Sequence, residues 1–360
     1  MRRLLLLLLL LTLPALAGAL ELTVPEGATA IDLTDQAALS DQQATELIDV
    51  LTRHPAVTDV DLTGVRVSAK TQARLMASCP NVLFRWNVMI GKLSVPSDTT
   101  VLDLDALASP STTFQQVRAG LALLPKLERV IMYKLIYRFE DMQRLLSEHP
   151  TVHFDWTIHW NVCKGRMINL RTDATAFSTR KGRQDPRYTA ETAMEKLQYC
   201  PDLLAIDLGH NNVSDLSFLQ NWPGLRRLII IDSKTPVTDL SPLAALDDLE
   251  YVELFMQNIT DISPLANKTK LLDLNLCHNN VTDLSPLYTC TSLERLHISY
   301  NPNLTQEEVD KLQAALPNCV IETETYQSTG AGWRTHPRYE VMAQSFVDCV
   351  YYPFDESKED

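Results

Sequence analysis

The stretch VTDLSPLAAL, residues 237–246, decides the fold because the chain repeats it in closely related form. Near-copies follow as ITDISPLANK at 259–268 and VTDLSPLYTC at 281–290, each starting 22 residues after the one before. A fixed period of about 20 to 50 residues indicates a stack of similar units, in which each unit covers the apolar face of its neighbour. The sequence therefore predicts a repeat solenoid in this part of the chain.

Five phrases in the C-terminal half share the form L-x-x-L-x-L, usually with an asparagine soon after. They are LLAIDLGHNNV (203–213), LRRLIIIDSKTPV (225–237), LEYVELFMQNI (249–259), LLDLNLCHNNV (271–281) and LERLHISYNPNL (293–304). Alternate residues of a strand point to one face, so the L-x-L pair enters the core and the residues beside it face outward. The asparagine amide can bond backbone groups that lack a ladder partner. Too few residues remain for a full helix after DLSPL, so we expect 3-10 turns there.

These phrases, from Pro201 to Asn303, resemble the 22-residue repeats of the internalin-type leucine-rich-repeat proteins of Gram-positive bacteria. The resemblance implies an α/β solenoid with a parallel β-sheet on its concave face and 3-10 turns on its convex face. The tail that contains Gly332, Trp333 and Arg334 is similar to secreted leucine-rich-repeat proteins of Firmicutes. That similarity implies a secreted bacterial protein.

The N-terminal half carries a longer and more degenerate repeat. The stretch CPNVLFRWNV (79–88) matches HPTVHFDWTI (149–158), with equivalent residues 70 positions apart. Amphipathic segments between such strands predict helices on the convex side. Three residue pairs predict capping boxes at helix starts: Ser40 with Gln43, Thr112 with Gln115, and Thr305 with Glu308. We expect one solenoid from about residue 28 to 323, interrupted at 171–199.

The first residues have the layout of a secretory signal peptide. Arg2 and Arg3 precede an unbroken leucine run, and small residues follow it, so we expect cleavage near Ala17 or Ala19. The alternative is an N-terminal membrane anchor that stays attached. The predicted organisation is a signal peptide at 1–19, degenerate strand–helix repeats at 20–170, an insertion with a helix at 171–200, leucine-rich repeats at 201–323 and a C-terminal cap or tail at 324–360.

Charge and cysteine content exclude some classes of function. The net charge of −13 argues against a nucleic-acid partner, because such binding depends on clustered lysine and arginine. No segment after the leader reaches the ~18 apolar residues of a membrane-spanning helix. The odd count of cysteines does not describe a disulfide framework, and we expect most to be small buried hydrophobes, with one or two bridges left open. The seven are Cys79, Cys163, Cys200, Cys277, Cys290, Cys319 and Cys349.

Motifs for catalysis and metal binding are weak. The STRK stretch (178–181) matches the S-x-x-K of serine acylases, but the partner motifs of those enzymes are missing. His153 and His159 would lie ~20 Å apart along a strand, which is too far for shared metal ligation with Cys163. The sequence therefore predicts no cofactor and no metal, and a non-enzymatic protein.

Outward-facing residues of the C-terminal repeats predict the binding site. Stacking brings them to ~5 Å spacing on the concave face, where an apolar patch with a polar rim would form. The predicted interface residues are Ile229, Ile231, Tyr251, Glu253, Phe255, Met256, His278, His297 and Tyr300. The alternative is that the segment after Glu324 or a neighbouring loop covers this patch.

The sequence as a whole predicts a secreted, monomeric binding protein whose concave face recognises a protein partner. A glycan-binding adhesin is one alternative, although Trp86, Trp156 and Trp160 are absent from the C-terminal concave columns. A hydrolase with its site in the 171–199 insertion and the C-terminal tail is the other.

Overall fold

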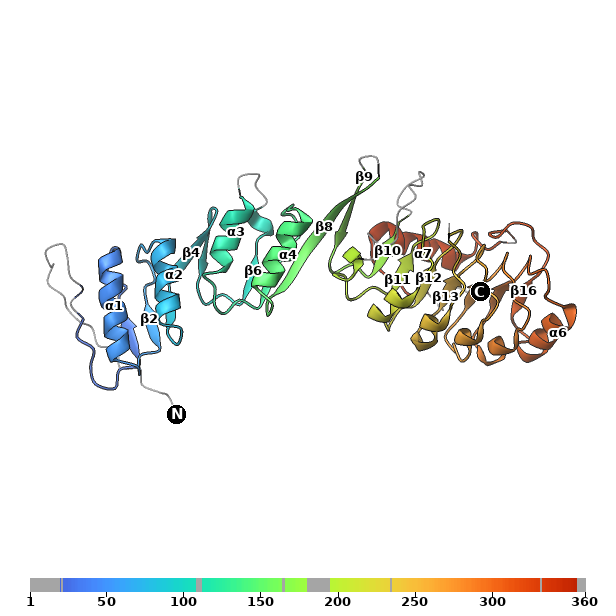
Figure 1. Ribbon diagram of the computed structural model, residues 1–360, viewed down its shortest axis with the longest axis horizontal. Helices are drawn as coiled ribbons and strands as arrows, with labels where there is room; N and C mark the ends of the chain where they lie inside the picture. Colours follow the sequence, from blue (N-terminus) through green and yellow to red (C-terminus); the bar gives the residue numbers. More distant parts are fainter. Residues whose placement is uncertain are drawn as a thin grey trace. The chain divides into compact units, whose positions relative to one another are not determined.

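A computed structural model describes residue 20 and residues 22–107, 112–163, 166–179, 195–233, 235–330 and 332–354 (Figure 1). The chain forms two compact units, which divide between Asp155 and Trp156. The predicted boundary at residue 170 thus lies inside the second unit. Within the described part of the chain, no helix combines the length and apolar character needed to cross a membrane.

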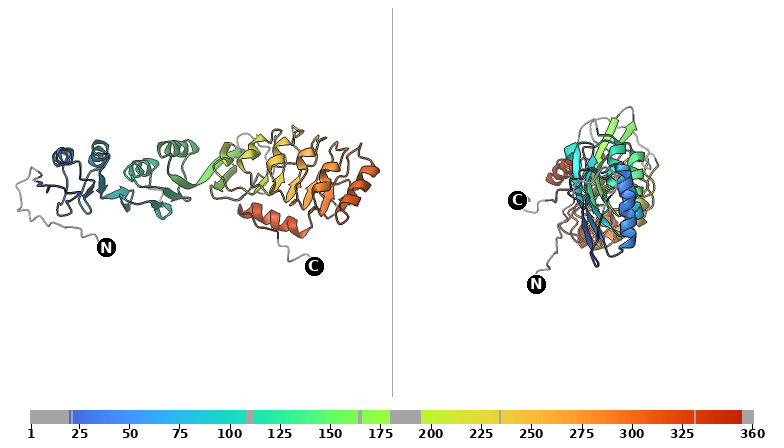
Figure 2. Two further views of the ribbon diagram at one scale, coloured as in Figure 1. Left: turned by 90° about the horizontal axis from the view of Figure 1, so that it is seen from below. Right: turned by 90° about the vertical axis from the view of Figure 1, so that its left-hand side faces the viewer.

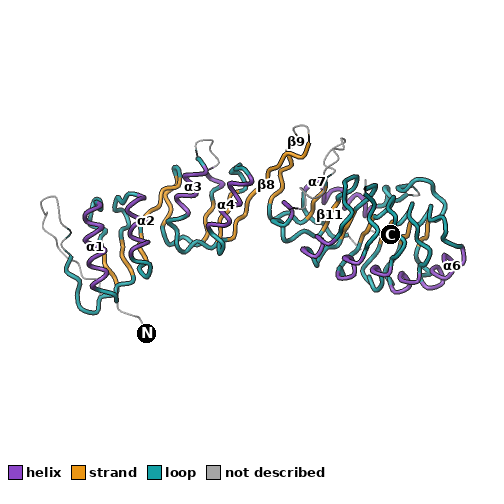
Figure 3. Tube along the Cα trace, viewed as in Figure 1, coloured by secondary structure: helices purple, strands orange, loops and turns teal. Residues whose placement is uncertain are grey.

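Short parallel strands alternate with helices in the first unit. Strands β1 (Ala30–Asp32), β2 (Asp59–Asp61) and β3 (Leu83–Arg85) form one parallel sheet, with α1 (Asp41–Arg53) and α2 (Ala69–Ser78) between them. Strands β6 (Val101–Asp103) and β7 (Arg129–Met132) are also parallel, and η1 (Asp105–Leu107), α3 (Phe114–Leu121) and α4 (Phe139–Glu148) complete the unit. The helices cover one side of these strands (Figure 3). The predicted strand–helix repeats are present.

The 70-residue duplication marks the two places where the chain forms an antiparallel hairpin. After β3, strands β4 (Asn87–Ile90) and β5 (Leu93–Pro96) form an antiparallel hairpin. Strands β8 (His153–Cys163) and β9 (Arg166–Arg171) form a second antiparallel hairpin. The backbone N–H of Trp86 donates to Ser97 Oγ, and the backbone N–H of Trp156 donates to Thr172 Oγ1, each at 3.1 Å. Strands β1–β3 and strands β6–β9 belong to separate sheets.

Caps at the helix starts are close to those predicted. Ser40 and Gln43 form the capping box of α1. The box of α3 is one residue later than predicted, with Thr113 and Gln116 as its members. Thr305 caps α6 (Gln306–Ala315) by accepting from the Glu308 N–H.

Seven parallel strands form the sheet of the second unit, in sequence order. They are β10 (Ala176–Ser178), β11 (Ala205–Asp207), β12 (Arg227–Ile229), β13 (Tyr251–Glu253), β14 (Asp273–Asn275), β15 (Arg295–His297) and β16 (Val320–Glu322). Strand β10 lies in the segment predicted as an insertion; it lacks the leucine phrase but pairs in register with β11. Residues 180–194 of that segment lie outside the described residues, as does the leader at 1–19.

The connections that lead from one strand of this sheet to the next contain 3-10 turns, as predicted. They are η2 (Ser217–Asn221), η3 (Ser241–Ala245), η4 (Ser263–Leu265) and η5 (Ser285–Thr289). In η3 the Asp239 carboxylate accepts from the Ser241 N–H at 2.8 Å, which lowers the pKa of Asp239. The second unit is therefore a leucine-rich-repeat solenoid.

A buried amide joins successive coils. Asn279 Nδ2 donates to the carbonyls of Leu276 at 3.0 Å and Leu254 at 2.9 Å, while its Oδ1 accepts from the Ile259 N–H at 3.1 Å. Asn301 repeats this pattern one coil later, and Gln257 does so one coil earlier. Each amide satisfies backbone groups of two coils that have no ladder partner.

Five of the six cysteines with described surroundings are buried free thiols, as expected of small hydrophobes: Cys79, Cys200, Cys277, Cys290 and Cys319. Burial raises the pKa of Cys277 and Cys319 to about 12. These thiols are therefore protonated at neutral pH.

Replacing Asn279 by alanine should destabilise the second unit by about 2 to 3 kcal/mol, because it leaves the Leu254 carbonyl and the Ile259 N–H unpaired in the core. Urea unfolding of the full chain measures this. The matched control is Asn280→Ala, because the Asn280 side chain is partly exposed. Equal stability of the two variants would show that the amide does not join the coils.

Candidate functional site

The predicted interface residues divide into a buried group and an exposed group. Buried are Ile229, Ile231, Tyr251, Glu253, Phe255 and His297, none more than 4% exposed. Met256 and Tyr300 are each 46% exposed, and His278 is partly exposed. The prediction that the first six form an open patch was wrong, because the C-terminal segment covers them.

We call residues 324–330 and 332–354 the strap. It contains α7 (Pro337–Asp348), which runs along the repeats of the second unit (Figure 2). Strands β11 to β14 are buried on both faces as a result, whereas β1 and β6 alternate between exposed and buried residues.

Apolar packing holds the middle of the strap on the sheet. Trp333 and Met342 are 4% and 1% exposed and belong to one hydrophobic cluster with residues of the concave face. The sheet contributes Ile229, Ile231, Tyr251, Phe255 and Cys277, and Tyr339, Phe346 and Phe354 of the strap pack against the cluster. The burial of these rings is the main favourable contribution to docking.

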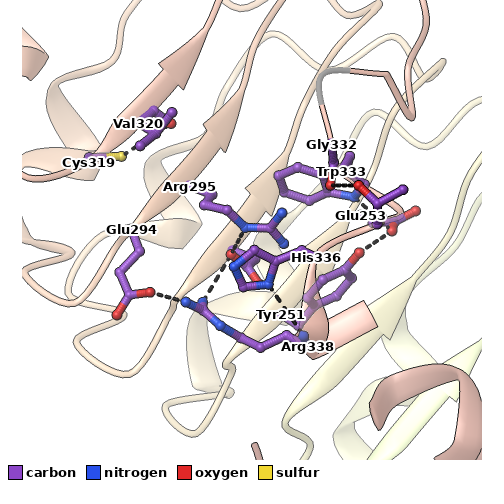
Figure 4. Close-up of polar contacts among 12 residues, drawn as sticks. Tyr251, Glu253, Glu294, Arg295, Cys319, Val320, Gly332, Trp333, His336 and Arg338 are labelled. Atoms are coloured by element: carbon purple, nitrogen blue, oxygen red, sulfur yellow. Dashed lines mark hydrogen bonds and ion pairs between the residues drawn. The ribbon is translucent and has the colours of Figure 1, made fainter. Parts of the chain in front are cut away.

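Glu253 on β13 is fully buried and is bonded by the strap (Figure 4). Its Oε1 accepts from Trp333 Nε1 at 3.0 Å and from the Tyr251 hydroxyl, and its Oε2 accepts from Arg334 Nη2 at 2.6 Å. Burial, together with the neighbouring Glu253 charge, raises the pKa of Tyr251 well above its ordinary value. The carboxylate thus accepts hydrogen bonds from three donors, one of which carries a positive charge.

Asp273 on β14 is the second buried carboxylate. Its Oδ1 accepts from Arg295 Nε at 2.7 Å and from Arg338 Nη1 of the strap at 3.1 Å. Arg338 also pairs with Glu294, as Figure 4 shows. The Arg295 guanidinium lies 4.5 Å from the centre of the Trp333 ring, which adds a cation–π contact.

Arg227 on β12 receives the end of the strap. Its Nη2 donates to the Tyr352 carbonyl at 2.6 Å and its Nη1 to Ser345 Oγ at 3.3 Å. The guanidinium lies 3.8 Å from the ring centre of Phe354. Burial lowers the pKa of Arg227. The strap therefore reaches from β14 back to β10, where the Cys349 carbonyl accepts from Thr175 and Ala176.

The exposed residues of the predicted site, Met256, His278 and Tyr300, belong to a column of left-handed residues, one per repeat. We call it the ridge: His210, Asp232, Met256, His278 and Tyr300, with φ between 48° and 61°. Each lies three residues beyond the last residue of its strand. The left-handed backbone is uncommon for residues with a side chain, and its recurrence shows that stacking imposes it.

Aromatic side chains gather at one end of the ridge. The rings of His278 and Tyr300 stack with centres 4.5 Å apart, and Tyr326 of the strap meets both edge-on. Tyr326 is 72% exposed. At the other end, His210 Nδ1 lies 3.0 Å from Asp232 Oδ2. The ridge thus combines exposed rings with hydrogen-bonding groups.

Other residues singled out by the sequence have local roles. His153 Nε2 lies 3.1 Å from Asp155 Oδ1, and His159 Nδ1 lies 2.7 Å from Asn169 Oδ1. Ser178 Oγ donates to Asp207 Oδ2 at 2.8 Å, and Thr179 is buried, while Arg180 and Lys181 of the STRK stretch lie outside the described residues.

The sequence reasoning missed Arg334 and Arg338, which bind the buried carboxylates. A signal for them existed. The concave columns contain Glu253 and, one strand on, Asp273, while the strap carries two arginines four residues apart. Buried carboxylates need cationic or hydrogen-bonding partners, so this charge complementarity could have located the strap.

Phe255→Ala should lower the free energy of unfolding by about 3 kcal/mol or more, because it opens a cavity beneath the strap. The adjacent Met256→Ala should change stability by less than about 1 kcal/mol, since Met256 lies at the surface. Urea unfolding measures the stability of both variants. An equal loss of unfolding free energy in the two would contradict the packing of Phe255 beneath the strap.

His297 should make the second unit sensitive to acid. Neither of its ring nitrogens has a hydrogen-bond partner in the described structure, and burial lowers its pKa from 6.5 to about 4. Between these values the unfolded chain binds a proton that the folded chain does not, so stability falls as pH falls from 6.5 to 4 and stays lower below 4. Wild type should lose about 3 kcal/mol more than His297→Asn over this range. If the free energy of unfolding fell by the same amount in the two proteins between pH 6.5 and pH 4, this prediction would be refuted.

The comparison with protein families agrees with the repeat geometry. The family model described as Leucine Rich repeats (2 copies) matches residues 269–313. No curated protein matches the chain significantly. Among solved structures, internalin C2 of Listeria monocytogenes is 18% identical, with 66% of this chain and 75% of that chain covered and a TM-score of 0.30.

Two further solved structures match this chain at similarly low sequence identity. An internalin (inlF) of Listeria monocytogenes is 17% identical, with 83% of this chain and 85% of that chain covered and a TM-score of 0.39. A leucine-rich-repeat protein of Leptospira interrogans is 14% identical, with 74% and 72% covered and a TM-score of 0.35. The match at 269–313, together with the seven parallel strands, identifies leucine-rich repeats in this chain.

Proposed function

We propose that the protein is an exported, monomeric and non-enzymatic binding protein, and that its partner is another protein. Solenoids of this kind present extended surfaces to partners. The strap occupies the centre of the concave face, so the partner docks on the part that stays open, which is the ridge and Tyr326. The observation that carries this proposal is the exposed cluster of Met256, His278, Tyr300 and Tyr326.

The chemistry of the cluster favours a protein surface with apolar groups and hydrogen-bonding groups together. Tyrosine offers a large rigid contact area and a hydroxyl, and it is enriched at residues that dominate interface energies. The stack of His278 on Tyr300, with Tyr326 across both, holds the rings in place before a partner arrives. Such preorganisation reduces the entropy lost on binding.

The ridge is also continuous with a packed interface. The His278 ring lies within hydrogen-bond distance of the Tyr326 carbonyl, at 3.1 Å, and Asn275 Nδ2 donates to the Ser328 carbonyl at 2.7 Å. The strap therefore supplies one wall of the proposed site and the repeats supply the other. A partner would contact both.

Tyr300→Ala and Tyr326→Ala should each weaken binding at least tenfold, a change of about 1.4 kcal/mol, with little change in melting temperature. A cell-surface protein captured by the wild type is purified, and its Kd is measured against each variant. Tyr288→Ala on η5 is the matched control, because it removes a tyrosine from the convex side.

Unchanged affinity in both Tyr300→Ala and Tyr326→Ala would place the site elsewhere, with the open strand faces of the first unit as the next candidate. A captured molecule that loses binding after periodate oxidation, but not after proteolysis, would identify a glycan ligand and overturn the proposal of a protein partner.

A further inference from the structure

The first described residue of the chain makes a specific contact with a helix. The backbone nitrogen of Leu20 donates to Glu46 Oε2 at 2.5 Å, and Glu46 lies on α1. Gln42 Nε2 donates to the other oxygen of the same carboxylate at 3.1 Å. Leu20, Leu22 and Thr23 line a surface pocket together with Glu46 and other residues of α1. The other three are Asp49, Val50 and Arg53.

The charge at this contact depends on whether the chain continues before Leu20. An internal amide N–H is neutral and offers one proton to the carboxylate. A free α-amino group is protonated below its ordinary pKa of about 8, and it offers a full positive charge at the same position. The second arrangement matches a carboxylate better, because charge-assisted hydrogen bonds are shorter and stronger than neutral ones.

We propose that export hydrolyses the peptide bond between Ala19 and Leu20, and that the new α-ammonium group of Leu20 forms an ion pair with Glu46. This inference depends on the export part of the proposed function. A signal peptidase adds the hydroxyl of water to the carbonyl carbon of Ala19, and the C–N bond breaks. The Leu20 nitrogen takes up the protons and becomes the ammonium group. Ala19 itself lies outside the described residues.

The contact distinguishes between the two cleavage sites that the sequence allows. Ala17 and Ala19 supply small residues at the positions that the peptidase reads when it cuts after Ala19. A cut after Ala17 would leave Gly18 and Ala19 in front of Leu20, so the Leu20 nitrogen would remain a neutral amide. The ammonium group would then lie up to ~7 Å of chain away from this nitrogen.

The neighbouring charges on α1 allow a matched test. Asp49 and Arg53 line the same pocket, but neither is the group that bonds the Leu20 nitrogen. Glu46→Gln keeps the shape of the side chain and removes its charge. Asp49→Asn removes a charge of the same sign from the same helix and serves as the control.

The first measurement is the N-terminal sequence and intact mass of the full chain exported by a host with a signal peptidase. We expect the mature protein to begin at Leu20. A mature protein that begins at Gly18, or that retains the leader, overturns the proposal.

The second measurement is the pKa of the terminal amine, followed by NMR after reductive ¹³C-methylation of the mature protein. The pKa should be about 1 unit higher in wild type than in Glu46→Gln, because the nearby carboxylate stabilises the ammonium form. Asp49→Asn should shift it by less than half as much. Equal pKa values in wild type and Glu46→Gln overturn the ion pair. Neither readout involves the ridge, so failure of the ridge variants to affect partner binding leaves this inference standing.

Discussion

Burial of two carboxylates on the concave face is the constraint on which the arrangement of the second unit depends. Glu253 and Asp273 are 0% exposed, and a buried carboxylate is tolerated only when it is paired and hydrogen-bonded. The strap supplies Trp333, Arg334 and Arg338 as partners. Removing one partner from such a pair costs about 3 to 5 kcal/mol, so the strap is part of the folded unit.

The position of the strap determines which surface of the repeats stays open to solvent. Stacked repeats create an extended concave surface, but here the middle strands are buried on both faces. The left-handed residue of each repeat lies beyond the strand and outside the strap, so its side chain stays accessible at Met256 and Tyr300. The left-handed position of each coil thus places the rings of His278 and Tyr300 at the edge of the concave face that the strap covers.

Local rules explain how far sequence reasoning succeeded. The leucine phrases predicted the strand register, because a period of two assigns every side chain to one face. The asparagine positions and the DLSP turns were also correct, since each depends on contacts within one coil or between neighbouring coils. The hairpins β4–β5 and β8–β9 were not predicted, although the 70-residue duplication marked both. Of the predicted interface, only Met256, His278 and Tyr300 proved accessible.

The sequence by itself determined the repeat, its register and the residues that face out of each coil, because these follow from the spacing of leucine, asparagine and proline along the chain. The tertiary structure alone decided which outward residues meet solvent. Residues far apart in sequence form that contact: Arg334 lies 81 residues after Glu253, and Tyr352 lies 125 residues after Arg227. Periodicity describes a strand and its neighbours, but it carries no information about a segment that returns across them.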